Sequence, residues 1–412
     1  MKKSLILIAK LLITTVFIAL FISFFQWFSH ELIHYSELFL EYNYWIVTLI
    51  ITLTTLFSIV IININNKYKG YLGSGVPQFE AYFDHNYQFS SVKMLILITI
   101  NSFFAYFSGF VLGGEGPSIT TAGAIGKSVN EMFKSEDKEL VEASCSAGFA
   151  CAFLAPVAGF CHLLEENKKH LTFSLLLKGL FIIFISSLIT YFVYPHNLLP
   201  NKAIVNLPFN LYYSLIFVVL YVLVFSYLFK KSILLTKDLN KKYNFMIYLT
   251  PILVIVFMLL KKFYPIFVGS GSIILSTDIY DMFLVCLVGL LIVRLIFSGL
   301  SANANVSGGI VLPMLAIGAL GGEIIVNVIS KFDTRIVDYN QVLKICTMVG
   351  VFAVVTNCPL TALILGLKMG EFSVVILPLT IVLVTLYFIL KFTKHHSIYK
   401  DLVKRLPNLE VH

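Results

Sequence analysis

The amino-acid sequence predicts an all-α protein that crosses a membrane many times. Hydrophobic residues make up 58% of its 412 residues, and charged residues make up only 13%. The apolar residues gather in runs of about 20, which is the length that an α-helix needs to cross a bilayer. A soluble domain of this size has no need for so much apolar sequence, so the composition excludes a soluble globular protein.

Eight apolar runs predict spanning helices. They lie near residues 4–28, 44–64, 94–112, 171–194, 209–229, 244–260, 280–299 and 374–392. The first run follows Met1-Lys2-Lys3 as a signal peptide does. Because it is too long and lacks a small-residue cleavage site, we expect it to be retained as a helix.

Three further apolar segments, 141–164, 308–330 and 343–368, are interrupted by glycine, proline or polar residues. Irregular backbone is tolerated at membrane depth only where protein surrounds it or where it lines a water-filled cavity. These segments therefore predict partly spanning or tilted helices that pack inside the protein.

The net charge of +8 comes mainly from lysines in short loops. Cytoplasmic loops of membrane proteins are rich in lysine, so this charge indicates topology and gives no sign of nucleic-acid binding. One predicted cytoplasmic loop carries Lys230, Lys231, Lys237, Lys241 and Lys242, and another carries Lys168 and Lys169. The chain ends are also basic, at Lys2, Lys3, Lys400, Lys404 and Arg405, which predicts that both termini are cytoplasmic.

The six cysteines lie in apolar segments without Cys-x-x-Cys spacing. They are Cys145, Cys151, Cys161, Cys286, Cys346 and Cys358. We expect small buried hydrophobic residues here, neither disulfides nor metal ligands.

The two halves of the chain repeat one order of signals. A stretch rich in proline and asparagine, from Pro195 to Pro208, divides a single transmembrane domain (1–412) into repeats of about 1–200 and about 205–412. Duplicated halves in transporters commonly have inverted topology, and we expect that arrangement here.

Each half contains the same pair of glycine loops. The first half has Gly-Ser-Gly at 73–75 and Gly-Gly-Glu-Gly-Pro at 113–117; the second has Gly-Ser-Gly at 269–271 and Gly-Gly-Ile-Val-Leu-Pro at 308–313. Gly73 to Gly113 is 40 residues, and Gly269 to Gly308 is 39. Glycine-led helix starts inside apolar sequence, repeated in both halves, predict a transporter whose binding site lies at mid-membrane.

Further along each half come a helix of small residues (122–126 and 316–321) and then a proline break. The breaks are Ala155-Pro156 and Cys358-Pro359. Small residues at this spacing let helix backbones approach closely within lipid, which predicts tight packing in the interior.

The loop at 73–77 places the hydroxyl of Ser74 at a helix start, with Pro77 suited to the first helical turn. A hydroxyl beside unpaired N–H groups at a helix N-terminus can bind an anion. The alternative is that Ser74 is an ordinary N-cap serine, which has the same sequence pattern and binds no anion. The echo at 269–271 and the apolar surroundings favour the anion site.

Glu115 is the most specific signal in the chain. A carboxylate in an apolar segment costs several kcal/mol unless it is paired or protonated, and such residues usually serve transport. At a helix start the helix dipole stabilises its charged form. Glu115 can thus fill an anion site itself and leave it when protonated, which would couple anion movement to proton movement. A helix-capping glutamate is the alternative.

Backbone groups complete the predicted site. The segment 308–313 offers no side-chain chemistry, but the N–H groups of Ile310 and Val311 can point at the same anion. Tyr399 lies beyond the last apolar run, where its hydroxyl can act as a second donor. Interfacial tyrosines often only anchor the protein, so Tyr399 alone is a weak signal.

Glu165 and Glu166 end an apolar helix on the predicted cytoplasmic side. A carboxylate there can take protons from the cytosol and pass them towards Glu115, although solvated acidic residues at helix ends are common. In the second half Lys368 and Met369 stand at the matching positions, so the two carboxylates belong to one half only. That asymmetry favours a function.

A rival hypothesis is a membrane-embedded metal enzyme. His162, Glu166 and His170 share one helix face at i, i+4 spacing. Neither His-Glu-x-x-His nor its inverted form occurs, and the nearby lysines indicate a solvated helix end, so the sequence disfavours this hypothesis.

Taken together, these motifs resemble the CLC family of chloride channels and proton-coupled chloride antiporters. The resemblance extends from the first Gly-Ser-Gly loop to Tyr399 and includes the double glutamate after the Ala-Pro break. It implies inverted repeats, a homodimer with one pathway per subunit, no enzymatic activity, and no cofactor or metal besides chloride as the transported ligand. It also implies a location in the plasma membrane of a prokaryote.

The resemblance assigns roles to the same residues. Ser74 and Tyr399 are similar to the hydroxyl donors of a central chloride, and the N–H groups of Ile310 and Val311 to its other ligands. Glu115 resembles the gating glutamate, and Glu166 resembles the internal proton-transfer glutamate. The expected function is chloride/proton antiport, and a passive chloride channel of the same fold is the alternative.

Three positions depart from the family pattern. Gly114 stands where arginine is usual, Val311 replaces a usual phenylalanine, and Lys368 stands where many members have glutamate. The first two put anion affinity and the tightness of coupling in doubt. Serine at position 74 argues against the nitrate-preferring and fluoride-exporting branches.

Overall fold

The computed structural model describes residues 2–85, 87–166, 171–196, 205–393 and 395–406. These residues form helices and connecting loops, and they contain no β-strand. The first half holds α1 (Lys2–Glu41), α2 (Tyr44–Lys67), α3 (Val76–His85), α4 (Ser91–Phe107), α5 (Glu115–Met132), α6 (Lys138–Phe153), α7 (Pro156–Glu166) and α8 (Phe173–Val193).

The second half follows with helices of similar lengths. It holds α9 (Ser214–Tyr243), α10 (Met246–Phe263), α11 (Ser272–Ser276), α12 (Leu284–Asn303), α13 (Val311–Ile329), α14 (Asn340–Thr356), α15 (Pro359–Met369), α16 (Phe372–Phe392) and α17 (Ile398–Val403). Short 3₁₀ turns lie at Lys69–Tyr71, Phe209–Leu211, Pro265–Phe267 and Thr334–Tyr339. The prediction of an all-α membrane protein is confirmed.

Nine helices of the described chain are long and apolar enough to cross a membrane. Seven of the eight predicted runs are among them. The exception is the run at 94–112, where α4 ends at Phe107 and the chain continues as the loop that carries Gly113. The segment at 141–164 is broken as predicted, because α6 ends at Phe153 and α7 begins at Pro156.

The segment at 308–330 differs from the prediction. After its glycine pair it forms one uninterrupted helix, α13, which is long enough to span. Pro313 does not break it, because it lies in the first turn, where a backbone N–H has no helical partner to lose. The segment at 343–368 is broken as expected, between α14 and α15.

The interior helices α5, α6, α13 and α14 pack backbone against backbone. A Cβ added to Gly148 on α6 would lie 2.3 Å from the carbonyl oxygen of Ser118 on α5. A Cβ on Gly318 of α13 would lie 2.4 Å from the Cα of Met348 on α14. Only glycine fits at these contacts, which confirms the predicted close packing of small-residue helices.

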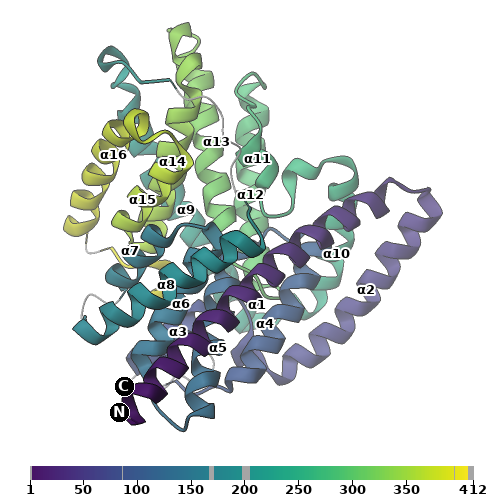
Figure 1. Cartoon of the computed structure of the whole chain (residues 1–412). Coiled ribbons are helices and arrows are strands. Elements are labelled where there is room, and N and C mark those ends of the chain that lie inside the picture. Colours follow the sequence, from purple (N-terminus) through teal and green to yellow (C-terminus); the bar gives the residue numbers. More distant parts are fainter. Residues whose placement is uncertain (1, 86, 167–170, 197–204, 394, 407–412) are drawn as a thin grey trace.

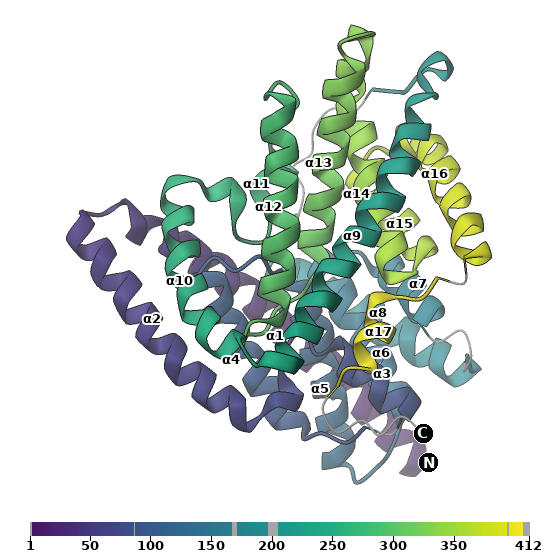
Figure 2. The same cartoon turned by 180° about the vertical axis from the view of Figure 1, so that it is seen from behind.

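The outer helices present apolar side chains outward. In Figures 1 and 2, α2 runs along one edge of the molecule, α16 lies at the opposite edge, and α1 crosses one face between them. Exposed residues on α2, α8 and α16 include Leu53, Phe192 and Phe388. For a protein that crosses a membrane, this outward apolar surface is the one that faces lipid. It also explains Cys286, which is exposed on α12, whereas the other five cysteines are buried as predicted.

Candidate anion site

Three loops that are far apart in the sequence are hydrogen-bonded into one junction. Gly113 and Gly309 exchange backbone hydrogen bonds of 2.8 and 2.7 Å, and the N–H of Gly308 donates to the carbonyl oxygen of Gly73 at 3.4 Å. The helices α3, α5 and α13 begin next to these contacts, at Val76, Glu115 and Val311. Three helix N-termini, each with unpaired N–H groups, therefore start from this loop junction (residues 73–75, 113–116 and 307–311).

The loop junction is too tight for side chains at its centre. A Cβ on Gly116 would lie 2.8 Å from the Cα of Gly309 and 3.0 Å from the Cβ of Ser74. The carbonyl oxygen of Ser74 accepts a hydrogen bond of 2.6 Å from the hydroxyl of Thr120 on α5, which fixes the first loop against that helix. The glycines in these motifs are needed for this close approach.

Glu115 is the first residue of α5 and is buried, with 2% of its surface exposed. A Cβ on Gly113 would lie 2.5 Å from its Oε2 and 2.8 Å from the Cβ of Leu312. The carboxylate is therefore held beside the first turn of α13. Within the described residues Oε2 has no hydrogen-bond partner, which is rare for a buried carboxylate and typical of a functional one.

Ser74 and Ile310 line one small cavity of about 40 Å³, which has room for about one water molecule. Lys237 of α9 and Leu402 of α17 line the same cavity. The hydroxyl of Ser74 makes no hydrogen bond within the described chain, so it is free to donate into the cavity. Val311 is buried as the first residue of α13, where its N–H belongs to the unpaired first turn.

Tyr399 lies on α17, which packs against α3. Its ring is buried, and its hydroxyl has no hydrogen-bond partner in the part of the chain that the structure describes. Glu166, Glu80 and Glu115 all act on this hydroxyl electrostatically. Tyr399 does not line the cavity that Ser74 and Ile310 share.

The two adjacent glutamates at the end of α7 have different surroundings. Glu165 caps α15: its carboxylate accepts hydrogen bonds from the N–H of Leu360 at 2.9 Å and from the N–H and hydroxyl of Thr361 at 2.8 and 2.7 Å. Within the described residues, the hydrogen bond that Glu166 accepts comes from the thiol of Cys358, at 3.3 Å. The capping role of Glu165 is structural, which leaves Glu166 available for proton transfer.

Sequence reasoning missed one carboxylate, Glu80 on α3. Both of its oxygens are buried without a hydrogen-bond partner in the described chain, and Glu166 is the charged group that acts on it most strongly. A buried carboxylate without a hydrogen-bond partner is costly in its charged form, which favours binding of a proton there. A signal was present, because Glu80 is a carboxylate in an apolar helix six residues after Ser74.

Lys368 mirrors Glu165 across the two halves. Its amine donates to the carbonyl oxygens of Phe153 and Leu154, the latter at 2.6 Å, at the C-terminal end of α6. Glu165 therefore caps a helix start with negative charge, and Lys368 caps a helix end with positive charge. The departure from the family pattern at Lys368 has a structural explanation.

The metal hypothesis gains no support from the described residues. His162 stacks on the ring of Phe149 at a centroid distance of 4.9 Å, and its Nδ1 lies 3.2 Å from the hydroxyl of Ser146. These are packing contacts of a core histidine. Within the described ranges no three His, Cys, Asp or Glu side chains gather as metal ligands do, and His170, Lys168 and Lys169 lie outside those ranges.

The profile of a protein family described as voltage gated chloride channel matches residues 56–391, which is most of the chain and includes the whole loop junction. The chain belongs to the CLC family. The predicted resemblance is therefore confirmed.

Curated CLC relatives are similar over most of their length. The chain is 29% identical over 354 residues to a protein of Vibrio campbellii named H(+)/Cl(-) exchange transporter ClcA, covering 81% of this chain and 74% of that protein. It is 27% identical over 352 residues to the protein of the same name from Vibrio parahaemolyticus, with the same two coverages.

Solved CLC structures share the fold. A slow cyanobacterial Cl⁻/H⁺ antiporter superposes with a TM-score of 0.82 at 20% identity, covering 97% of both chains. A CLC-type fluoride/proton antiporter superposes with a TM-score of 0.75 at 18% identity, covering 95% of this chain and 97% of that one. These likenesses confirm the CLC architecture of the present chain.

Proposed function

We propose that this CLC chain exchanges chloride for protons across a membrane. The observation that carries the proposal is a buried carboxylate, Glu115, at the point where three helix N-termini meet. The N-termini form a positive environment that suits an anion. Glu115 is itself an anion in that environment, so it competes with chloride for the same place. Because protonated Glu115 would leave the site and make room for chloride, the movement of protons would be coupled to the movement of chloride.

Chloride would be held between the first half and the second. Ser74 and Ile310 line one cavity, and the N–H of Val311 belongs to the adjoining helix start. The hydroxyl of Tyr399 would be the remaining donor. Its missing partner supports this role, because a buried hydroxyl without any hydrogen bond is costly unless a ligand supplies one.

Protons would travel by a partly separate route between the cytosol and Glu115. Glu166, at the end of α7, and the buried Glu80 of α3 lie within electrostatic reach of one another, and a proton passing between them would link the cytosolic side to the interior. Tyr399 lies within electrostatic reach of this pair and of Glu115, which supports a short interior step between them. Glu165 takes no part in this route, because both of its oxygens cap α15.

A passive chloride channel remains the alternative. Two features favour the antiporter: an ionisable residue stands at position 166, and the curated relatives are named as exchangers. A pore without coupled protons has no use for the carboxyl groups of Glu80 and Glu166.

The assembly and orientation follow from family membership and charge. We propose a homodimer with one pathway in each subunit, in the plasma membrane of a prokaryote, and a single domain made of two inverted repeats. The basic residues near both chain ends and in the segment 230–242 support cytoplasmic termini. By that topology the C-terminal ends of α1 and α10 face outward.

The direct test uses purified protein in liposomes that hold a chloride gradient and no proton gradient. We expect chloride moving down its gradient to drive protons in the opposite direction, against the gradient that develops, and a proton ionophore to abolish the pH difference. Chloride flux with no uphill proton movement would reject the antiporter and establish the channel alternative.

A further inference from the structure

A large cavity opens between α1, α10 and the segment 270–273 at the start of α11, on the side that the proposed topology places outward. Its volume is about 650 Å³. Gln26 of α1 lies at its inner end, where its amide donates to the hydroxyl of Ser118 at 3.2 Å and lies close to Gly114. Gly114 directly precedes Glu115, so this outer cavity leads towards the loop junction.

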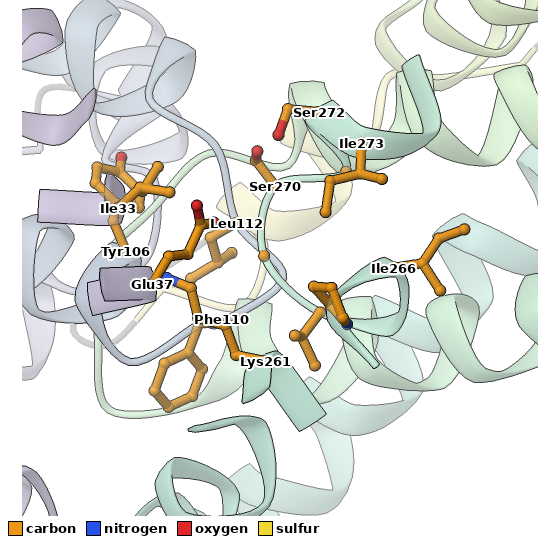
Figure 3. Close-up of a pocket in the computed structure, with 14 residues that line it drawn as sticks. Ile33, Glu37, Tyr106, Phe110, Leu112, Lys261, Ile266, Ser270, Ser272 and Ile273 are labelled. Atoms are coloured by element: carbon orange, nitrogen blue, oxygen red, sulfur yellow. The ribbon is translucent and has the colours of Figure 1, made fainter. Parts of the chain in front are cut away.

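A smaller cavity of about 40 Å³ continues the outer cavity inward. The two share Glu37, Lys261, Ser270 and Ser272, and the smaller one reaches Leu112, next to Gly113. Figure 3 shows Glu37 of α1 and Lys261 of α10 on one side of it, and on the facing side Ser270, in the loop before α11, and Ser272, the first residue of α11. An ion that approaches Glu115 by this route passes Lys261.

Lys261 is a buried cation whose anionic neighbour in the cavities, Glu37, is exposed. Only 8% of its surface is exposed, and its amine donates to the hydroxyl of Ser36. Within the described residues no carboxylate forms an ion pair with it. Burying an unpaired charge is costly, and a mobile anion held in the adjoining cavity offsets that cost.

A second buried cation lies behind the same loop. Arg294 is fully buried and donates to the carbonyl oxygens of Ile266 and Val268 at 3.1 Å and of Gly269 at 3.0 Å. It also has no carboxylate partner in the described chain. Because these three residues line the smaller cavity, its wall has positive charge behind it.

The remaining charged groups of the outer cavity are more exposed than Lys261, and one of them, Glu37, also lines the smaller cavity. They are Glu37, Glu41, Lys262, His30 and His196. Glu37 and Glu41 are exposed, so water and salt screen their negative charge, whereas the buried charge of Lys261 is screened much less. The field at the inner end of the outer cavity is therefore positive.

We propose that Lys261, with the hydroxyl of Ser270 on the facing loop, forms an outer capture site for a small monovalent anion such as chloride. Ser270 makes no hydrogen bond within the described residues, which leaves its hydroxyl available to the anion. The site holds the anion before it reaches the place that Glu115 occupies. This inference rests on the proposed function, because the captured anion is the transported one.

The test compares chloride uptake in right-side-out and inverted membrane vesicles from a bacterial host that makes the full chain. The variants are Lys261→Met, Lys261→Arg and Ser270→Ala. The matched control is Lys262→Met, because Lys262 lines only the wider cavity and its amine is already bonded to the carbonyl oxygen of Leu40. Vesicles from the host without the protein give the background.

We expect Lys261→Met to raise the KM for chloride by at least about fivefold in right-side-out vesicles, the factor for a unit charge about 4 Å away in bulk water, because the buried charge is screened less than that. The maximal rate and the number of protons per chloride should stay unchanged, as should the KM in inverted vesicles. Lys261→Arg should restore the KM to within about twofold of the wild type, and Lys262→Met should differ from it by less than that.

An unchanged KM in Lys261→Met would overturn the capture site, and so would an equal rise in both vesicle types. If Lys261→Met does not fold, Ser270→Ala decides: an unchanged KM for outer chloride rejects the site. These failures differ from failure of the proposed function, in which wild-type vesicles would show no chloride-driven proton movement.

Discussion

At the scale of single residues, the hydrogen-bond partners of a carboxylate distinguish a functional glutamate from a structural one. Glu165 and Glu166 are neighbours, and the sequence offers no way to tell them apart. In the structure Glu165 caps α15 with both oxygens, whereas Glu166 contacts the thiol of Cys358 and lies within electrostatic reach of Glu80. Glu115 was predictable, because its flanking glycines and apolar setting are local signals. The proximity of Glu80 to Glu166 was not, because it joins α3 to α7.

The glutamate pair gives a matched comparison. Glu166→Gln should suppress proton flux strongly while chloride flux persists, because an amide cannot carry a proton between water and Glu115. Glu165→Gln should keep coupled transport but lower the free energy of unfolding by about 1 kcal/mol, the usual cost of a lost helix cap. Proton and chloride fluxes in liposomes and thermal unfolding in detergent measure both effects. Equal proton fluxes in the two variants would remove Glu166 from the route.

Tyr399 allows a second test at this scale, because its buried hydroxyl has no partner in the described chain. Tyr399→Phe should therefore leave thermal stability unchanged or slightly higher, since the lost group made no hydrogen bond in the protein. Chloride binding, measured by titration calorimetry on the purified protein, should weaken by about fivefold, the value of one hydrogen bond of about 1 kcal/mol. Lower stability with unchanged chloride affinity would show that the hydroxyl serves the fold instead.

At the scale of elements, the broken helices were predictable, and the connections between them were not. The breaks at Pro156 and Pro359 follow from local rules on proline, and the residues before them show how the chain turns. Leu154 and Asn357 both adopt left-handed backbone, with φ of 49° and 63°. Asparagine accepts this conformation readily and leucine rarely does, so only the second turn had a local signal.

One connection between elements is a buried ion pair. Lys344 of α14 and Glu323 of α13 lie 2.7 Å apart with 2% and 0% of their side chains exposed. The same carboxylate accepts from the N–H of Ile279, and Lys344 donates to the carbonyl oxygen of Thr277. The pair thus ties both interior helices to the loop before α12.

Breaking this ion pair from one side should be costly. Lys344→Met alone leaves the buried carboxylate of Glu323 unpaired and should lower the free energy of unfolding by about 3–5 kcal/mol. Glu323→Met should cost less, because Lys344 keeps Asp278 at 3.9 Å. The double variant removes both charges, and we expect it to recover most of that loss. Thermal unfolding of the three variants in detergent measures this, and a double variant no more stable than the worse single one would contradict the account.

At the scale of the whole molecule, the apolar composition and the length of the apolar runs predicted the membrane fold. The glycine motifs predicted where the site would be. What no local signal gives is the contact between Gly113 and Gly309, or the approach of Gly73 to Gly308, because these loops are about 200 residues apart in the sequence. The repeated motifs made such a meeting plausible, and the packing of α3, α5 and α13 realises it. The outer cavity at Lys261 likewise depends on the packing of α1 near α10, which no local sequence motif predicts.

The central claim is that Glu115 competes with chloride and carries the proton. The measurement that tests it most directly is the chloride flux and the proton flux of Glu115→Gln, recorded on the same liposomes beside the wild type. The account predicts that chloride flux continues, because a neutral side chain no longer competes for the anion site, and that proton flux falls to the background of empty liposomes. Proton movement that remains coupled to chloride in this variant would contradict it.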